Sequence, residues 1–337
     1  MIFPFHILKI VKADNLFNRI VKAPSVPYDG PFTKSLYWKD IENNGKEIVK
    51  DKKFALSDRA HLAVWQSKSN LIQATIKRVH AGRYQLTFFR GLADALFSLS
   101  EQVVEVFGTR FNLEREQCHR LIAGSASEII YWHEFAHLAR GHISVLDECF
   151  QDVSISELAT SRVVESTTQV ADQKNHSDTF SAYSRNDLIR LLEIDADIYG
   201  AIFTLGRITK VLKNNKNIIP AKEWLLAHFL GVRTAYAVLH QKDPTEDQKH
   251  KLSSHPHSRV RSAYALSHSI SKIGVRSFGV TDDTAIGLFN ELFIEFDKKI
   301  FHDITDSALL QGSLKELAAW RTFSDLLIPY QLLQVKE

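Results

Sequence analysis

Residues 131–142, YWHEFAHLARGH, form the segment that most constrains what this chain can fold into. Two histidines, His133 and His137, stand four positions apart, and Glu134 follows the first of them. Positions four apart share one face of an α-helix, so both imidazoles can bind a single metal ion. A carboxylate beside the first ligand can take a proton from a metal-bound water. The segment is therefore predicted to be a helix that carries part of a metal site.

The helix has a predicted start and end. Ser125 and Glu128 match the Ser-x-x-Glu pattern of a capping box, which places the start just before Ile129. Gly141 is the natural stop, so the helix is expected to run to about Arg140. Its apolar residues recur at the spacing of a buried face: Ile129, Trp132, Ala136 and Ala139.

His-Glu-x-x-His alone is weak evidence in a chain with 15 histidines, so a third ligand is needed. The metzincin pattern requires glycine and histidine where this chain has Arg140 and Ile143, and it is excluded. His142 would lie about 140° around a continuing helix from His137. We therefore expect His142 to be a polar residue at the helix C-terminus.

A glutamate from a later helix is the third ligand in the gluzincin pattern. The segment LEIDADIYG supplies Glu193 and, four residues later, Asp197. Both share one helical face, so Glu193 can bind the metal while Asp197 accepts the outer ring N–H of a histidine, with His133 the expected donor. Asp195 is expected to face solvent. The alternative is an acidic helix turn that forms surface ion pairs.

A third segment, SHPHSRVR, places His255 before Pro256 and Arg261 farther along the next helix. Either side chain could stabilise the oxyanion of a tetrahedral intermediate, and Arg261 could instead pair with Asp197. The alternative is an ordinary helix N-terminus with satisfied polar groups.

The order HEFAH, EIDAD and HP-x-x-x-x-R resembles gluzincin peptidases of the CAAX-protease and heat-shock-peptidase type, over roughly residues 83–265. Those proteins are embedded by transmembrane helices, which this sequence lacks. The strand-to-helix segment RYQLTFFRGLADAL followed by HEFAHLARGH and EIDAD is also similar, more weakly, to Lit-like phage-exclusion peptidases, which implies cleavage of a specific cytosolic protein. The first resemblance implies one Zn²⁺ and these roles: His133, His137 and Glu193 as ligands, Glu134 as base, Asp197 as support and Arg261 as the late arginine.

Composition places the chain among globular proteins. Its 337 residues are 45% hydrophobic and 24% charged, with a net charge of +3. The basic residues are scattered, so no nucleic-acid partner is expected. Cys118 and Cys149 form no disulfide framework, which fits a reduced cytoplasmic setting. No signal peptide or membrane span is expected.

The fold class predicted from these patterns is α+β and mainly α. It comprises a zincin-like core with a small β-sheet or hairpin and a helical C-terminal extension. Strands are expected over residues 70–79 and 83–89, joined by a turn at Ala81-Gly82. Two helices are expected to begin near Gly91 and near Asn186. Three more are expected over residues 221–239, 283–301 and 313–333, and a marginal helix over 163–173.

Three domains are predicted: an N-terminal flank (1–66), a metallopeptidase domain (67–275) with a polar insertion (143–185), and a C-terminal helical extension (276–337). The predicted function is zinc-dependent hydrolysis of peptide bonds in a cytosolic protein, with Glu134 as general base. The alternative is a catalytically silent or latent zincin-fold protein that acts as a sensor or partner-binding module. A Cys or Ser nucleophile lacks a local signature. The sequence does not give the oligomeric state.

Overall fold

The computed structural model describes residues 60–67, 69–150, 154–156, 178–213, 219–240, 258–301 and 319–332. The chain divides into two compact units. The first comprises Met1–Asp94, His137–Ala182 and Leu326–Glu337, and the second comprises Ala95–Ala136 and Tyr183–Asp325. The division falls inside helix α4 (Arg115–Ala139), which is continuous across it.

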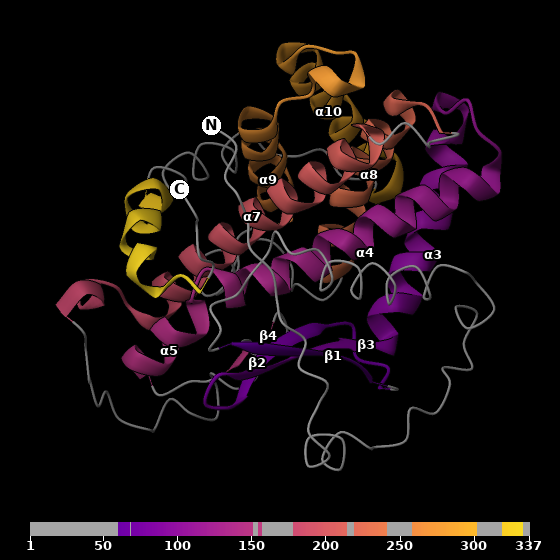
Figure 1. The fold of residues 1–337 in the computed structure, drawn as a ribbon. Helices are drawn as coiled ribbons and strands as arrows, with labels where there is room; N and C mark the ends of the chain where they lie inside the picture. The colour runs from indigo at the N-terminus through magenta and orange to yellow at the C-terminus, as the bar shows by residue number, and fades with distance from the viewer. Residues whose placement is uncertain are drawn as a thin grey trace. The chain divides into compact units, whose positions relative to one another are not determined.

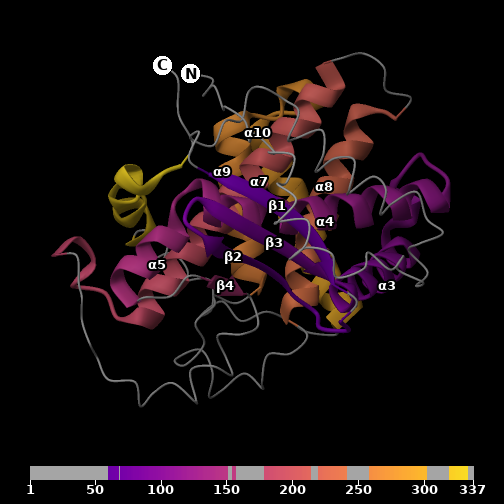
Figure 2. The same cartoon turned by 60° about the horizontal axis from the view of Figure 1, so that its bottom comes forward.

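The first unit contains a four-stranded mixed sheet in the order β1-β3-β2-β4 (Figure 2). Strand β3 pairs in parallel with β1 and antiparallel with β2, and β2 pairs antiparallel with β4. The bounds are β1 (His61–Ser67), β2 (Ala74–His80), β3 (Arg83–Phe89) and β4 (Ser154–Ser156). The predicted strand at 83–89 is confirmed, and β1 lies almost wholly within the predicted N-terminal flank.

The β2–β3 hairpin follows from its sequence. The turn contains Ala81 and Gly82, and Gly82 has a φ of 68°, which glycine adopts without steric cost. Alternating residues bury one face of the sheet, because Ala74 lies opposite Phe88 and Ile76 opposite Leu86. This apolar face forms the core of the sheet.

Helix α5 (His142–Phe150) belongs to the same unit and follows the end of α4. Gly141 separates the two helices with a φ of 78°, and its N–H donates to the carbonyl of Leu138. A β-carbon at Gly141 would lie 2.0 Å from the carbonyl oxygen of Tyr330, so only glycine fits. The chain near its C-terminus also contacts α4, because the Leu332 N–H donates to the Ala139 carbonyl.

The second unit is helical. Its helix α7 packs along α9, and the two lie side by side in Figures 1 and 2. Helix α3 (Arg90–Phe107) begins in the first unit and continues into the second. The other helices that the structure describes are α7 (Arg185–Lys213), α8 (Ala221–His240), α9 (Ser258–Ile273) and α10 (Asp282–Phe296). A π-helical turn (Asp297–Phe301) follows α10, and one more helix covers residues 319–326.

Aromatic side chains fill the interior between α4 and α7. The ring of Phe203 on α7 lies 5.3 Å from that of Trp132 and 5.9 Å from that of Phe135, both on α4. Buried aromatic pairs of this kind add stability beyond their burial. They hold the motif-bearing part of α4 against α7.

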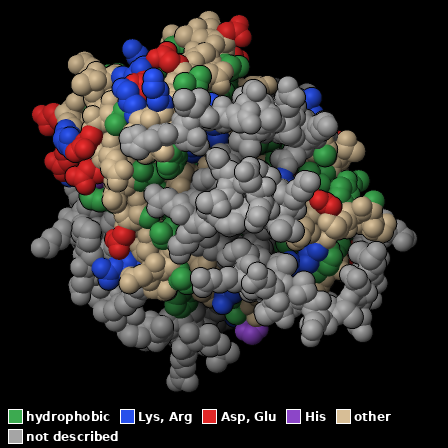
Figure 3. All heavy atoms as spheres, turned by 180° about the vertical axis from the view of Figure 1, so that it is seen from behind, with side chains coloured by type: hydrophobic (Ala, Val, Ile, Leu, Met, Phe, Trp, Pro, Cys, Tyr) green, Lys and Arg blue, Asp and Glu red, His purple; other side chains and the backbone are tan. Residues whose placement is uncertain are grey.

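Charges of both signs lie side by side on the face shown in Figure 3. Elsewhere in the described residues, the Arg110 guanidinium pairs with Glu291 at 2.9 Å and also with Glu295. Such exposed pairs contribute little individually to stability. In the part of the chain that the structure describes, no helix combines the length and apolar character needed to cross a bilayer.

The mainly helical α+β class is confirmed, whereas one predicted boundary is wrong. Helix α4 begins at Arg115, well before the capping-box start predicted near Ile129. Ser125 lies inside the helix, where its side chain packs beside Gly231 of α8. The small side chain therefore serves helix packing rather than capping. The marginal helix predicted over 163–173 lies outside the described residues.

Candidate metal centre

The motif residues occupy the last two turns of α4. His133, Glu134 and His137 are all buried, each at most 1% exposed. The helix is buried on nearly all sides over this stretch, because Tyr131, Trp132, Phe135, Ala136 and Leu138 are buried as well. The two histidines thus share one helix face in an apolar surround, where ionisable groups need specific partners.

Glu193 on α7 reaches the histidines. One ligand atom from each of His133, His137 and Glu193 lies within 4.8 Å of the other two. His133 Nε2 lies 3.4 Å from Glu193 Oε2. This buried His-His-Glu group could hold a metal ion.

Asp197, one turn beyond Glu193, contacts the other nitrogen of His133. Its Oδ1 lies 2.8 Å from His133 Nδ1, as predicted from the sequence. A proton on Nδ1 leaves the Nε2 lone pair directed toward Glu193. This contact suits the tautomer of His133 that could bind a metal through Nε2.

Arg261 on α9 joins the two carboxylates. Its Nε donates to Asp197 Oδ2 at 2.8 Å, and its Nη2 donates to Asp197 Oδ1 at 2.9 Å and Glu193 Oε2 at 3.3 Å. The guanidinium also lies 4.8 Å from the ring centroid of Tyr236. Arginine suits this position because its planar fork matches a carboxylate.

These contacts decide the ionisation of Asp197. Burial alone would raise the pKa of this carboxyl, but the charge of Arg261 and the hydrogen bond from His133 together hold it below its ordinary value. Asp197 is therefore a carboxylate and accepts hydrogen bonds only. Its negative charge also favours a cation bound by the neighbouring histidine.

Gly200 sets the distance between α4 and α7 at the site. A β-carbon at Gly200 would lie 2.9 Å from the backbone nitrogen of His133 and 3.1 Å from its Cα. Gly200, Asp197 and Glu193 fall three and seven residues apart, on the same face of α7. The glycine lets the helices approach closely enough for both carboxylates to reach His133. No motif in the sequence points to Gly200, because its role depends on how closely α4 and α7 pack.

His142 is buried beside a motif histidine, and the prediction that it is a polar residue at the C-terminus of the motif helix is wrong. Its Nδ1 lies 2.8 Å from Nδ1 of His137, and it is the first residue of α5 rather than a polar end of α4. The expected 140° separation assumed a continuing helix, whereas α4 ends at Ala139.

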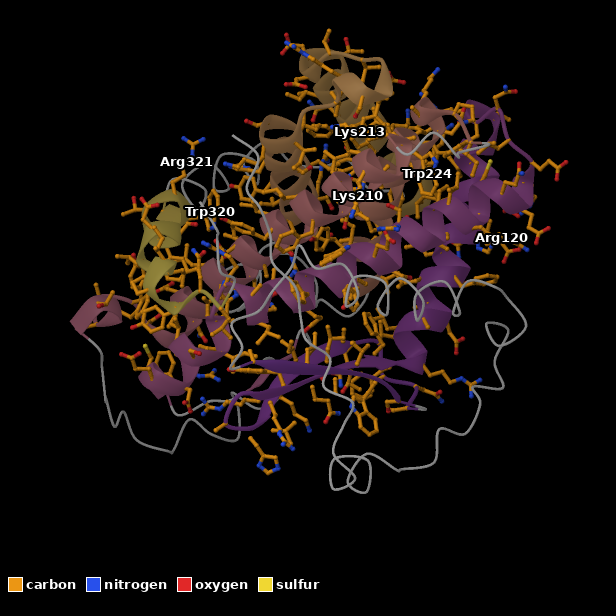
Figure 4. All side chains as sticks on the ribbon, in the orientation of Figure 1. Arg120, Lys210, Lys213, Trp224, Trp320 and Arg321 are labelled. Carbon is orange, nitrogen blue, oxygen red and sulfur yellow. The ribbon has the colours of Figure 1, made fainter. Side chains whose placement is uncertain are left out.

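Asp195 was expected to face solvent, and this prediction is wrong because its exposed fraction is 0%. Its Oδ1 accepts hydrogen bonds from Trp320 Nε1 at 2.9 Å and Ser324 Oγ at 3.2 Å. Both donors lie on the helix over 319–326, which carries Trp320 and the exposed Arg321 labelled in Figure 4. A helix distant in sequence therefore covers this side of α7.

Of the predicted site residues, His255 lies outside the described part of the chain. The structure brings together five of the predicted site residues: His133, His137, Glu193, Asp197 and Arg261. Glu134 follows His133 on α4.

No protein-family model, curated protein or solved structure matches this chain.

Proposed function

We propose that the protein is a zinc-dependent peptidase whose metal is held by His133, His137 and Glu193. The observation that carries the proposal is the convergence of these three buried side chains within 4.8 Å. Two imidazoles and one carboxylate are a donor set found in catalytic zinc sites, which retain a fourth position for water. The position of Asp197 Oδ1, 2.8 Å from His133 Nδ1, supports the same proposal, because a proton held between these two atoms would leave Nε2 for the metal.

Zinc bound at this group would lower the pKa of a coordinated water and polarise the scissile carbonyl. Glu134 is the general base in the proposed reaction. Its carboxylate takes one proton from water as the water oxygen bonds to the carbonyl carbon. Glu134 then gives that proton to the amide nitrogen as the carbon–nitrogen bond breaks, which yields one carboxylic acid and one amine.

Arg261 has a supporting role in this scheme. Its contacts with Asp197 and Glu193 favour bracing of the two carboxylates over direct stabilisation of an oxyanion. Asp197 in turn holds His133 through its outer nitrogen. His255 keeps its proposed role at the oxyanion as an expectation from the sequence.

The substitution Glu134→Gln tests the reaction. It preserves the shape of the side chain and removes its basicity, so zinc content is expected to stay unchanged while peptide hydrolysis falls at least about 100-fold. Glu128→Gln is the control, because Glu128 lies on the same helix and pairs with Arg207 instead. A mixture of fluorogenic peptides and an unfolded protein serves as substrate. Full hydrolysis by the Glu134→Gln variant would exclude the proposed mechanism.

A second candidate function, a latent or non-catalytic zinc protein, is favoured by the burial of the group. Glu134, His137 and Glu193 are all fully buried, whereas a working peptidase must admit a peptide. In this case the purified protein binds zinc and hydrolyses no peptide.

A further inference from the structure

His137 and His142 form a buried imidazole pair at the end of the motif helix. Their Nδ1 atoms are 2.8 Å apart, with the ring centroids 5.0 Å apart and the ring planes at 74°. This distance is a hydrogen bond, so one Nδ1 carries a proton and the other accepts it. Both side chains are fully buried.

The direction of this hydrogen bond decides whether His137 can bind a metal. Because His142 engages Nδ1 of His137, we take Nε2 as the His137 atom offered to the group formed with His133 and Glu193. Nε2 can bind only if its lone pair is free, so the proton of a neutral His137 must lie on Nδ1. The opposite polarity would put the His137 proton on Nε2 and block coordination.

We propose that His142 is a positioning residue that holds His137 in the metal-binding tautomer, an inference that rests on the proposed metal site. In this arrangement His142 accepts through an unprotonated Nδ1 and carries its own proton on Nε2. The ring of His137 is fixed in orientation as well as in tautomer. Groups that hydrogen-bond to a ligating histidine commonly change metal affinity about 10–100-fold when they are removed.

The two histidines of the motif therefore have different partners. Asp197 Oδ1 lies 2.8 Å from Nδ1 of His133, and His142 Nδ1 lies 2.8 Å from Nδ1 of His137. Gly141 is what allows the second contact, because its positive φ ends α4 and turns the chain into α5. His142 would otherwise project from a different side of α4.

Three substitutions of His142 separate positioning from packing. His142→Asn places its amide oxygen where Nδ1 stands, two bonds from Cβ, and can accept the same hydrogen bond. His142→Gln places its oxygen one bond farther, at the location of Nε2, and His142→Leu has no acceptor. We expect zinc affinity near the wild-type value for the asparagine variant and a loss of about 10–100-fold for the other two.

The measurement is the zinc dissociation constant from competition with a chromophoric chelator, with apo-protein thermal unfolding recorded for every variant. The ¹⁵N imidazole spectrum of the zinc-loaded wild type is recorded as well, since it does not depend on any variant folding. The proposal predicts a proton on Nε2 of His142 and on Nδ1 of His137.

Equal zinc affinity in all three variants, or a proton on Nδ1 of His142, would overturn the positioning role while leaving the metal site intact. Absence of zinc binding by the wild type would overturn both proposals. Loss of zinc affinity in the leucine and glutamine variants, together with lost hydrolysis at unchanged zinc content in Glu134→Gln, supports both proposals.

Discussion

Gly200 on α7 lies against the backbone of His133 on α4, so closely that a β-carbon there would sit 2.9 Å from the histidine nitrogen. Real β-carbons do not approach backbone atoms at this distance, so a larger residue must push the helices apart. Glu193 and Asp197 lie on the same face of α7 and would move with it. This contact makes the geometry of the candidate metal centre depend on Gly200, a residue with no side chain to bind metal or substrate.

We therefore expect Gly200→Ala to destabilise the protein by about 1–3 kcal/mol, the usual range for overpacking, and to weaken zinc binding. Gly206→Ala is the matched control on the same helix, because its β-carbon would meet only Ile273 Cδ1 at 3.7 Å. That change should be neutral or stabilise by up to about 1 kcal/mol. Urea unfolding and zinc titration measure both effects, and similar results for the two glycines would refute the close-packing argument.

Arg261→Met removes the cation that holds two buried carboxylates. The expected cost is about 3–5 kcal/mol, because Glu193 and Asp197 are then left as buried charges without their cation. Arg110 also pairs with two carboxylates, but its side chain is 34% exposed. Arg110→Met should cost at most about 1 kcal/mol. Equal losses in chemical denaturation would show that burial is not what distinguishes the two arginines.

Trp320→Phe removes the indole N–H that donates to the buried Asp195. A hydrogen bond to a charged group contributes about 1.5–3 kcal/mol, and a loss in that range is expected in thermal or urea unfolding. Trp224→Phe is the control, because Trp224 Nε1 has no hydrogen-bond partner among the residues that the structure describes (Figure 4). Combining Trp320→Phe with Asp195→Asn should cost less than the sum of the single changes; strict additivity would argue against a direct interaction.

His228 makes the fold sensitive to acid. Burial lowers the pKa of this histidine from 6.5 to about 3, and neither ring nitrogen has a hydrogen-bond partner within the described part of the chain. Above pH 6.5 the group is neutral in both states and has no effect on the pH dependence. Between pH 6.5 and 3 only the unfolded chain takes up the proton, so stability falls as pH falls, by up to about 5 kcal/mol in total.

The variant His228→Leu should remove this contribution and flatten the stability profile between pH 6.5 and 3. His80→Leu is the control, because His80 is exposed at the end of β2. The measurement is the free energy of urea unfolding at a series of pH values. A slope that persists in His228→Leu would assign the acid sensitivity to other groups.

Local spacing was enough to predict much of the site. His133 and His137 share a helix, and Glu193 and Asp197 share another, because four residues make about one helical turn. The contact of Asp197 with His133 follows from the same geometry once the two helices meet. The β2–β3 hairpin was also readable, since a glycine turn joins two strand-forming segments.

The parts that were missed depend on contacts between distant segments. Asp195 looked solvent-facing because nothing in the EIDAD segment indicates that Trp320 covers it. His142 was misplaced because its position depends on the break at Gly141, which Tyr330 packs against. The early start of α4 was hidden because Ser125 looks like a cap in sequence but lies inside a buried helix.

The zinc content of the purified protein tests the central proposal most directly. Metal analysis after reconstitution and removal of free zinc should give one zinc ion per wild-type chain, and much less than one in Glu193→Ala and His137→Ala. Glu223→Ala is the matched control, because Glu223 is also a buried glutamate but lies on α8, outside the metal group. Unchanged zinc in Glu193→Ala, with a folded protein, would contradict the assigned ligand set.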